Sequence, residues 1–501
     1  MNIKSKTIAG VGWMGFEKWS RQILSFAIFT ILARLLDPSI FGVVALAGIY
    51  MALLEIFVTQ GFSMALVQRR EIDRGHLDTA FWLSIFAASV IVIVTLLAAP
   101  VAANYLHEPA LTLILRSLSL AFLITALNVV PSALLMRDMA FDRLAIRSLS
   151  GVIAAGVAGL ACAWAGLGVW SLVAQQLIGA VAGTIALWAV TSWRPGLSVS
   201  KRHLADLRSF SMAIMGNNIL WFFSRKSDEA IVGGSLGVAA LGAYSVANRL
   251  TTIVLDLLNS PAQVVALPAL SKIQDDKGRI GRSLVKGTTV MCAIGLPAFT
   301  GLLILAPMAL PVLFGPKWIT AVPVIQVLCI AGMLRVWQGM VDPTMLALGR
   351  PWAYLALFSL HAGVTIVASL LAVRTGRAEA VALAQVASNL ITGAANFYVL
   401  HRFTGFNVLE LVAGITRVGL PCAVMACAIV FFQGWIDGYD INKIVALTAC
   451  IIVGVIVYLA LGRITLASEL KYVMNAIRSR HEQDTIESSR KADPLVVDHR
   501  Y

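Results

Sequence analysis

Long apolar runs separated by short polar segments extend through nearly the whole chain. Each run is close to the roughly 20 apolar residues that a helix needs to cross a hydrocarbon core of about 30 Å. Runs bounded by charge, Pro or Gly predict fourteen spans, at residues 9–35, 39–63, 79–103, 111–134, 147–165, 168–190, 209–232, 240–265, 285–308, 322–347, 352–373, 379–401, 410–432 and 440–462. Because an open strand edge in lipid leaves backbone groups unpaired, the spans are predicted to be helices. We therefore expect an all-α polytopic membrane protein.

Composition agrees with this pattern. Of 501 residues, 59% are hydrophobic and 13% are charged, and the mean hydropathy is +0.83. Soluble domains have about 25% charged residues. The six cysteines lie in apolar runs without CxxC spacing, so they are interpreted as packing residues. The chain has no P-loop, HExxH or GxSxG motif. We therefore expect neither an enzyme nor a bound metal or cofactor.

Basic residues predict the orientation, because Lys and Arg are retained on the cytoplasmic side. They gather in alternate loops, which hold Arg69, Arg70 and Arg74; Arg137 and Arg143; Arg194, Lys201, Arg202 and Arg208; Lys272, Lys277, Arg279, Arg282 and Lys286; Arg350; and Arg402. Both termini group with this set, so both are predicted to be cytoplasmic. The net charge of +13 therefore indicates topology and contact with anionic lipid, and not nucleic-acid binding, which would need one basic stripe with interleaved aromatics.

The chain also contains an internal repeat. Residues 36–43 read LDPSIFGV and residues 236–243 read LGVAALGA, which aligns Gly42 with Gly242 at an offset of 200 residues. Parallel six-span repeats predict a pseudo-two-fold axis along the membrane normal, with a cavity between two lobes. The predicted parts are an N-terminal lobe at 1–190, a basic cytoplasmic linker at 191–208, a C-terminal lobe at 209–402, two extra spans at 403–462 and a cytoplasmic tail at 463–501, read as an interfacial helix followed by a disordered end.

Ionisable residues deep in a span are costly unless they face water or a partner, and here they cluster in spans one, two, seven and eight. The forked, permanently charged guanidinium of Arg suits phosphate. Predicted substrate-binding residues are Arg21, Arg225, Arg249, Arg34 and Asn248, and predicted ion-coupling or charge-pair residues are Glu17, Glu55, Asp228 and Asp256. The alternative is pairing within a helix, of Glu17 with Arg21 and of Arg225 with Asp228 or Glu229. Arg34 is close enough to the outer interface to snorkel.

Several segments resemble one known family. These are ARLLDPSIFGVVAL, QGFSMALVQRREIDRGHLDTAFWLS, FDRLAIRSL, VLFGPKWITAVPVIQVL and MLALGRP. They are similar to the Wzx-type polysaccharide transporters, flippases of lipid-linked oligosaccharides in the multidrug/oligosaccharidyl-lipid/polysaccharide exporter superfamily. The resemblance implies two six-helix lobes around a central cavity and alternating access between inward-open and outward-open states. In related lipid flippases, cations of spans one, two and eight line the cavity. Arg21 and Arg249 fall on matching spans, whereas span two carries Glu55 in place of a cation.

The substrate that this resemblance implies is an oligosaccharide on undecaprenyl pyrophosphate. It would be carried across the bacterial inner membrane for exopolysaccharide, capsule or O-antigen (lipopolysaccharide) synthesis. We expect Arg21, Arg225 and Arg249 to bind the pyrophosphate, and Glu55 or Asp256 to couple transport to H⁺ or Na⁺. Expected partners are membrane lipids, a polysaccharide polymerase and a chain-length regulator.

Three rival functions stay open from the sequence. A cation-coupled multidrug antiporter would want an acidic, aromatic-lined cavity, which the excess of Arg argues against. A membrane polysaccharide polymerase or ligase would need a large outer loop, and every predicted outer loop is short. A lipid II flippase shares much of the expected architecture.

Overall fold

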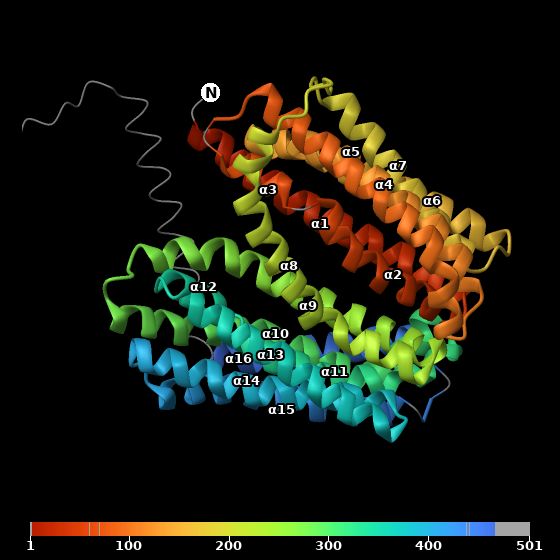
Figure 1. Ribbon diagram of the computed structural model, residues 1–501. Helices are drawn as coiled ribbons and strands as arrows, with labels where there is room; N and C mark the ends of the chain where they lie inside the picture. The colour runs from red at the N-terminus through yellow and green to blue at the C-terminus, as the bar shows by residue number, and fades with distance from the viewer. Residues whose placement is uncertain (1–2, 60, 70, 437, 440, 466–501) are drawn as a thin grey trace, which may run out of the picture. The chain divides into compact units, whose positions relative to one another are not determined.

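The computed structural model describes residues 3–59, 61–69, 71–436, 438–439 and 441–465, and these residues contain helices and no strand. Figure 1 shows the elements, which are α1 Ile3–Leu35, α2 Pro38–Thr59, α3 Phe62–Gln68, α4 Arg74–Tyr105, α5 Ala110–Arg137, α6 Phe141–Trp164, α7 Trp170–Val190, α8 Lys201–Leu236, α9 Val238–Ser271, α10 Lys277–Phe314, η1 Pro316–Ala321, α11 Val322–Trp337, α12 Val341–Ala347, α13 Pro351–Ala372, η2 Val373–Thr375, α14 Ala378–Thr404, α15 Val408–Ile436 and α16 Lys443–Thr465. The predicted interfacial helix and disordered end lie almost wholly beyond the described residues.

Twelve helical segments among the described residues are long and apolar enough to cross a membrane. The two long helices outside this set are α1, of 33 residues, and α8, of 36 residues. At 1.5 Å per residue each is about 50 Å long, which exceeds the thickness of a hydrocarbon core. Both are rich in charged residues, which lowers their hydropathy. The expected all-α membrane fold with about fourteen spans is confirmed, and the protein crosses the membrane many times.

The boundaries differ from the predicted spans in two ways. Most helices run a few residues past the apolar run, as α10 does at Lys277–Phe314 against the predicted 285–308, because a helix continues through its polar ends. Two predicted spans are also broken. The span at 39–63 ends as a helix at Thr59 and restarts as α3 after Gly61, whose φ of 67° favours glycine. The span at 322–347 divides into α11 and α12.

Contacts between helices divide the described chain into two compact units. The first contains Met1–Ile253, Ala306–Ala331 and Leu355–Thr392, without the undescribed residues at its start. Within it α6 packs on α7 and on α1, and α5 packs on α4, α2 and α7. The second contains Val254–Leu305, Gly332–Tyr354 and the described residues from Gly393 onward, and within it α15 packs on α16. The division into repeated lobes stays a prediction.

The start of α8 corrects one predicted boundary. The linker was expected to extend over 191–208, but α8 begins at Lys201, so the last eight residues of that range are helical. Ser200 caps the helix, since its Oγ accepts a hydrogen bond from the Arg202 amide at 3.3 Å. The irregular connection between α7 and α8 is therefore only ten residues long, 191–200.

The two glycines aligned by the internal repeat lie against each other in the first unit. A Cβ on Gly42 of α2 would be 1.7 Å from the Val238 carbonyl oxygen of α9, and a Cβ on Gly242 would be 1.9 Å from the Pro38 carbonyl oxygen. The contact is reciprocal, because Pro38 and Val238 are also 200 residues apart and begin their helices. Small residues let two helix backbones approach this closely in a membrane. The first turns of α2 and α9 therefore cross at a glycine pair.

This crossing predicts a stability difference between two substitutions in α2. Gly42→Ala would place a methyl carbon in steric overlap with the Val238 carbonyl oxygen, so the two helices would have to separate. Overpacking of this kind costs about 1–3 kcal/mol. Gly48→Ala is the matched control, because a Cβ there meets nothing within 4 Å and Ala favours the helix. Thermal unfolding of the purified protein in detergent should rank Gly42→Ala below wild type and Gly48→Ala at or above it. Equal unfolding temperatures for the two variants would contradict the crossing.

Candidate functional site

One face of α1 carries a row of polar and aromatic side chains. Glu17, Arg21, Ser25 and Phe29 follow one another at intervals of four residues, which places them on the same side of a helix. Arg21 Nε donates to Glu17 Oε1 at 3.1 Å, so the intrahelical pair that the sequence offered as the alternative is present. Arg147 of α6 also interacts electrostatically with Glu17. Even so, 46% of the Arg21 side chain is exposed. Its guanidinium therefore retains donors for another group.

Arg249 of α9 packs onto the same face of α1. Its Nη2 donates to Ser25 Oγ at 3.2 Å, and its guanidinium carbon lies 4.2 Å from the centre of the Phe29 ring. Arg249 is exposed. Since Arg21 and Ser25 are one turn apart, about 6 Å along the axis, the structure brings the two arginines to one exposed face of α1. These are two of the predicted substrate-binding residues.

Arg34 has a different environment, at the end of α10. Its Nε donates to the Leu313 carbonyl at 2.8 Å and its Nη2 donates to the Val312 carbonyl. The last carbonyls of a helix lack partners within the helix and carry partial negative charge, so a cation stabilises them. Arg34 therefore caps α10. Trp318 makes the neighbouring contact, donating from Nε1 to the Ala33 carbonyl at 2.8 Å. A substrate contact for Arg34 stays a prediction.

The acidic residues of α8 are buried and held by different partners. Glu229 is 4% exposed, and its two oxygens accept hydrogen bonds from Lys226 Nζ and Asn248 Nδ2, both at 2.6 Å. Burial of a carboxylate is tolerated when a cation and a hydrogen-bond donor neutralise it. The predicted substrate ligand Asn248 thus donates one amide hydrogen to Glu229.

Asp228, which directly precedes Glu229, has hydrogen-bond partners on only one of its two carboxylate oxygens among the described residues. Oδ2 accepts a hydrogen bond from Tyr244 Oη at 2.7 Å and one from Gln385 Nε2 at 2.9 Å. Oδ1 is buried and accepts no hydrogen bond from the described residues, and Gln385 Oε1 is in the same state. Buried polar atoms normally have partners. Two buried oxygens without donors are suited to a proton or a small cation.

The remaining predicted site residues are Arg225, Glu55 and Asp256. Arg225 was considered as a partner of Asp228 or Glu229, but its guanidinium lies over the Trp221 ring, 4.6 Å from the centroid. The pairing is wrong, because Lys226 pairs with Glu229 and because Asp228 accepts from Tyr244 and Gln385. Glu55 is exposed on α2. Asp256 belongs to the second unit.

Sequence reasoning missed three residues of these networks. Tyr244 and Gln385 are the partners of Asp228, and Arg147 lies within electrostatic range of Glu17 while its Nη1 donates to Ser132 Oγ at 3.2 Å. Each carries a polar group in or at the start of an apolar run, which was the only available signal. Tyr and Gln are common enough in membrane helices that this signal does not identify a partner.

Comparisons with known proteins agree on one family. The family described as polysaccharide biosynthesis protein matches residues 31–323, more than half of the chain. Lipopolysaccharide biosynthesis protein WzxC of Escherichia coli (strain K12) is 26% identical over 341 residues, covering 67% of this chain and 68% of that one. Succinoglycan biosynthesis transport protein ExoT of Rhizobium meliloti (strain 1021) is 27% identical over 485 residues, covering 95% and 97%.

Two solved structures share the fold. The lipid II flippase MurJ in an inward closed conformation matches with a TM-score of 0.72 and 12% identity, covering 91% of this chain and 99% of that chain. An inward-facing multidrug resistance MATE family transporter of the MOP superfamily matches with a TM-score of 0.61 and 13% identity, covering 76% and 95%. At such low identity these matches concern the fold alone. The sequence resemblance is thus confirmed: the chain belongs to the polysaccharide biosynthesis protein family, as a multi-pass membrane protein of the Wzx type.

Proposed function

We propose that this protein is a flippase that carries an undecaprenyl-pyrophosphate-linked oligosaccharide across the bacterial inner membrane by alternating access. The observation that carries the proposal is the exposed face of α1, where Arg249 of α9 donates to Ser25, the residue one helical turn after Arg21. The names of the relatives support the general class, since they belong to lipopolysaccharide biosynthesis and succinoglycan transport. The transport step involves no covalent chemistry.

The exposure of these arginines favours a polar cavity over lipid. A guanidinium facing hydrocarbon costs several kcal/mol, so membrane arginines face protein or water. Arg21 retains free donors although Glu17 takes one, and Arg249 is anchored by a neutral hydroxyl and a ring. Arg can bind phosphate through two parallel hydrogen bonds. One such side chain from α1 and one from α9, meeting at the same face of α1, suit a pyrophosphate.

The chemistry of the substrate explains why such a surface is needed. A pyrophosphate and its glycan cannot enter about 30 Å of hydrocarbon unaided, because charged and hydroxyl groups lose their hydration there. The prenyl tail has no such cost and stays in lipid. The protein therefore has to shield only the head group while the tail follows in the bilayer.

For coupling to H⁺ or Na⁺, Asp228 is the strongest of the four predicted acids. It is 2% exposed and one of its oxygens has no donor among the described residues. Glu17 is already paired with Arg21, and Glu55 is exposed. Asp256 stays a candidate in the second unit. A cation bound at Asp228 would contact the oxygen that has no donor. Because Asp228, Tyr244 and Gln385 lie on α8, α9 and α14, the bound cation would favour the arrangement that holds these three helices together.

Charge reversal tests the arginine pair. Arg21→Glu and Arg249→Glu should each abolish polysaccharide export in a strain that lacks the chromosomal copy, because the reversed charge repels pyrophosphate. Membrane abundance should be unchanged, and lipid-linked oligosaccharide should accumulate on the inner leaflet, measured by mass spectrometry. Arg374→Glu, at an exposed arginine of η2, is the matched control and should export normally. Full export by both α1-face variants would overturn the assignment.

Neutralising one buried acid tests the coupling step. Asp228→Asn keeps the side-chain shape but removes the charge that would attract a cation. In proteoliposomes it should lower ion-gradient-driven transport by at least about tenfold, equivalent to about 1.4 kcal/mol, with unchanged substrate binding. Glu229→Gln is the control, because both oxygens of that buried carboxylate already have partners, and it should keep its gradient dependence. Normal driven transport by Asp228→Asn would exclude Asp228.

The proposed orientation places both termini in the cytoplasm. Green fluorescent protein fused after Tyr501 should therefore fluoresce, and alkaline phosphatase fused there should be inactive. Fusions after Tyr439, between α15 and α16, should give the opposite pattern. An active phosphatase at the C-terminus would reverse the orientation.

A further inference from the structure

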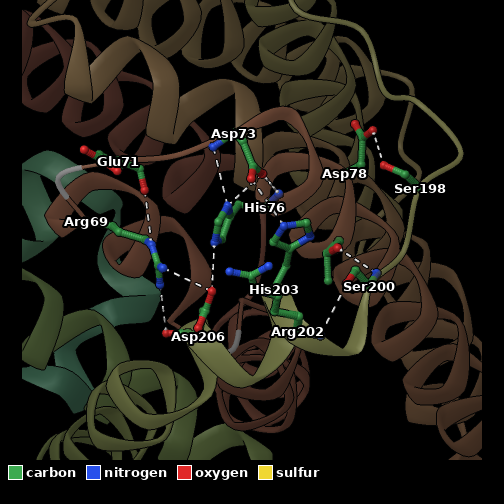
Figure 2. A network of polar contacts seen from close by, with 11 residues as sticks. Arg69, Glu71, Asp73, His76, Asp78, Ser198, Ser200, Arg202, His203 and Asp206 are labelled. Atoms are coloured by element: carbon green, nitrogen blue, oxygen red, sulfur yellow. Dashed lines mark hydrogen bonds and ion pairs between the residues drawn. The ribbon is translucent and has the colours of Figure 1, made fainter.

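A compact polar cluster lies where the connection between α3 and α4 meets the first turns of α8. Figure 2 shows Asp73 and His76 from the start of α4 converging with His203 and Asp206 from α8. The two histidine rings are 4.3 Å apart between centroids. All four residues belong to the first unit, and none takes part in the arginine or Asp228 sites.

Asp73 holds two roles in this cluster. It caps α4, because its Oδ1 accepts a hydrogen bond from the His76 amide at 2.9 Å, and that bond is the main cause of an Asp73 pKa lowered to about 2. The ionised carboxylate also contacts both imidazoles. Oδ1 is 2.8 Å from His76 Nδ1, and Oδ2 is 3.3 Å from His203 Nε2.

His76 lies between two carboxylates. While Nδ1 faces Asp73, Nε2 lies 3.3 Å from Asp206 Oδ2, and Arg69 Nη2 holds the same oxygen at 3.1 Å. A neutral imidazole carries one hydrogen and can donate to only one of these carboxylates. Donation to Asp206 leaves Nδ1 beside an anionic oxygen, where the Asp73 amide donates to it from 3.4 Å. A cation between Nδ1 and Oδ1 would replace the repulsion between these two atoms with a bond to each.

The backbone leaves room for the second imidazole. A Cβ on Gly75 would lie 2.3 Å from Cε1 and 2.6 Å from Nδ1 of His203, so glycine permits this approach. His203 Nδ1 is buried and has no hydrogen-bond partner among the described residues. The other nitrogen of this ring, Nε2, faces the Asp73 carboxylate at 3.3 Å, so His203 directs one of its two possible ligand atoms at the group that it shares with His76.

We propose that Asp73, His76 and His203 bind Zn²⁺, and that Asp206 orients His76. Two imidazoles and a carboxylate form a ligand set that zinc commonly takes, and a carboxylate on the outer nitrogen of a ligating histidine fixes its orientation. Zinc bonds of about 2.0–2.1 Å in a tetrahedron put ligand atoms roughly 3.3 Å apart. One ligand atom from each residue already lies within 4.8 Å of the others.

The local charges leave a net negative charge for a cation at this position. The N-termini of α4 and α8 carry partial positive charge, which disfavours a cation. Asp73 and Asp206 contribute two negative charges, of which Arg69 offsets one through its ion pair with Asp206 at 3.1 Å. A water molecule would take the fourth position.

The zinc site would attach the start of α8 to the start of α4. It lies beside hydrogen bonds that already attach α4 to the segment between α7 and α8. Asp78 accepts hydrogen bonds from the Gly196 amide and the Ser198 hydroxyl, both at 2.9 Å, and Trp82 Nε1 donates to the Gly196 carbonyl at 2.7 Å. These bonds tie α4 to residues 196–198. Zinc would extend the same attachment to the first turn of α8.

Zinc binding by the full-length protein tests the proposal. Protein purified in detergent with a histidine-free affinity tag is stripped with chelator, equilibrated with Zn²⁺ and desalted, and zinc is counted by mass spectrometry. Wild type should retain one Zn²⁺ per chain and unfold at a higher temperature with zinc present. Co²⁺ in its place should give the visible absorption of a tetrahedral site. Asp206→Asn should weaken binding about 10- to 100-fold, as loss of an orienting carboxylate does.

Substitutions of the ligands complete the test. His76→Gln with His203→Gln should remove the retained zinc and the thermal shift, whereas His107→Asn, at an exposed histidine after α4, should keep both. Wild type that retains no more zinc than the double variant would overturn the proposal and identify the cluster as a hydrogen-bonded clamp. Equal loss in His107→Asn would also overturn it.

Discussion

A charge inside the hydrocarbon core is costly unless it meets a partner or water, and the charged helices of this protein are organised by that requirement. Glu229 is buried with a lysine and an amide on its two oxygens. Arg34 is stabilised by hydrogen bonds to the last backbone carbonyls of α10. The exposed face of α1 differs from these, since Arg21 and Arg249 keep much of their surface open. We infer function from this exposure, because charge that the protein itself leaves open is available to a ligand.

Backbone polarity imposes the same requirement at the helix ends. The turn after α1 and the turn after α10 lie together, where Arg34, Trp318 and Lys317 bind Leu313, Ala33 and Asp37 respectively. Rings of Phe29, Phe41, Phe314 and Trp318 pack edge to face around these bonds. The glycine crossing of α2 and α9 adds a contact between backbones. One end of α1 is therefore fixed by several contacts, while the arginine face toward its middle stays accessible.

The histidine cluster and the Asp228 network share one property, an excess of hydrogen-bond acceptors, although they lie in different parts of the helices. At Asp228 a carboxylate has hydrogen-bond donors on one oxygen only. At His76 one imidazole contacts two carboxylates. Both sites have more acceptors than donors, so both are suited to a cation. The first lies within membrane helices and fits coupling, whereas the second lies at helix starts and fits structural attachment.

The sequence by itself determined the features that depend on neighbours along the chain. Apolar run length predicted the membrane helices, four-residue spacing predicted the pair of Glu17 and Arg21, and the repeat aligned Gly42 with Gly242. Only the tertiary structure decided which helix faces meet. It showed that Arg249 contacts Ser25 and Phe29, and that Tyr244 and Gln385 donate hydrogen bonds to Asp228. It also brought the rings of His76 and His203, more than 100 residues apart in the sequence, into contact. Periodicity reports which side of a helix is polar, but a long-range contact depends on how helices rotate and pack against one another, and one sequence does not specify that.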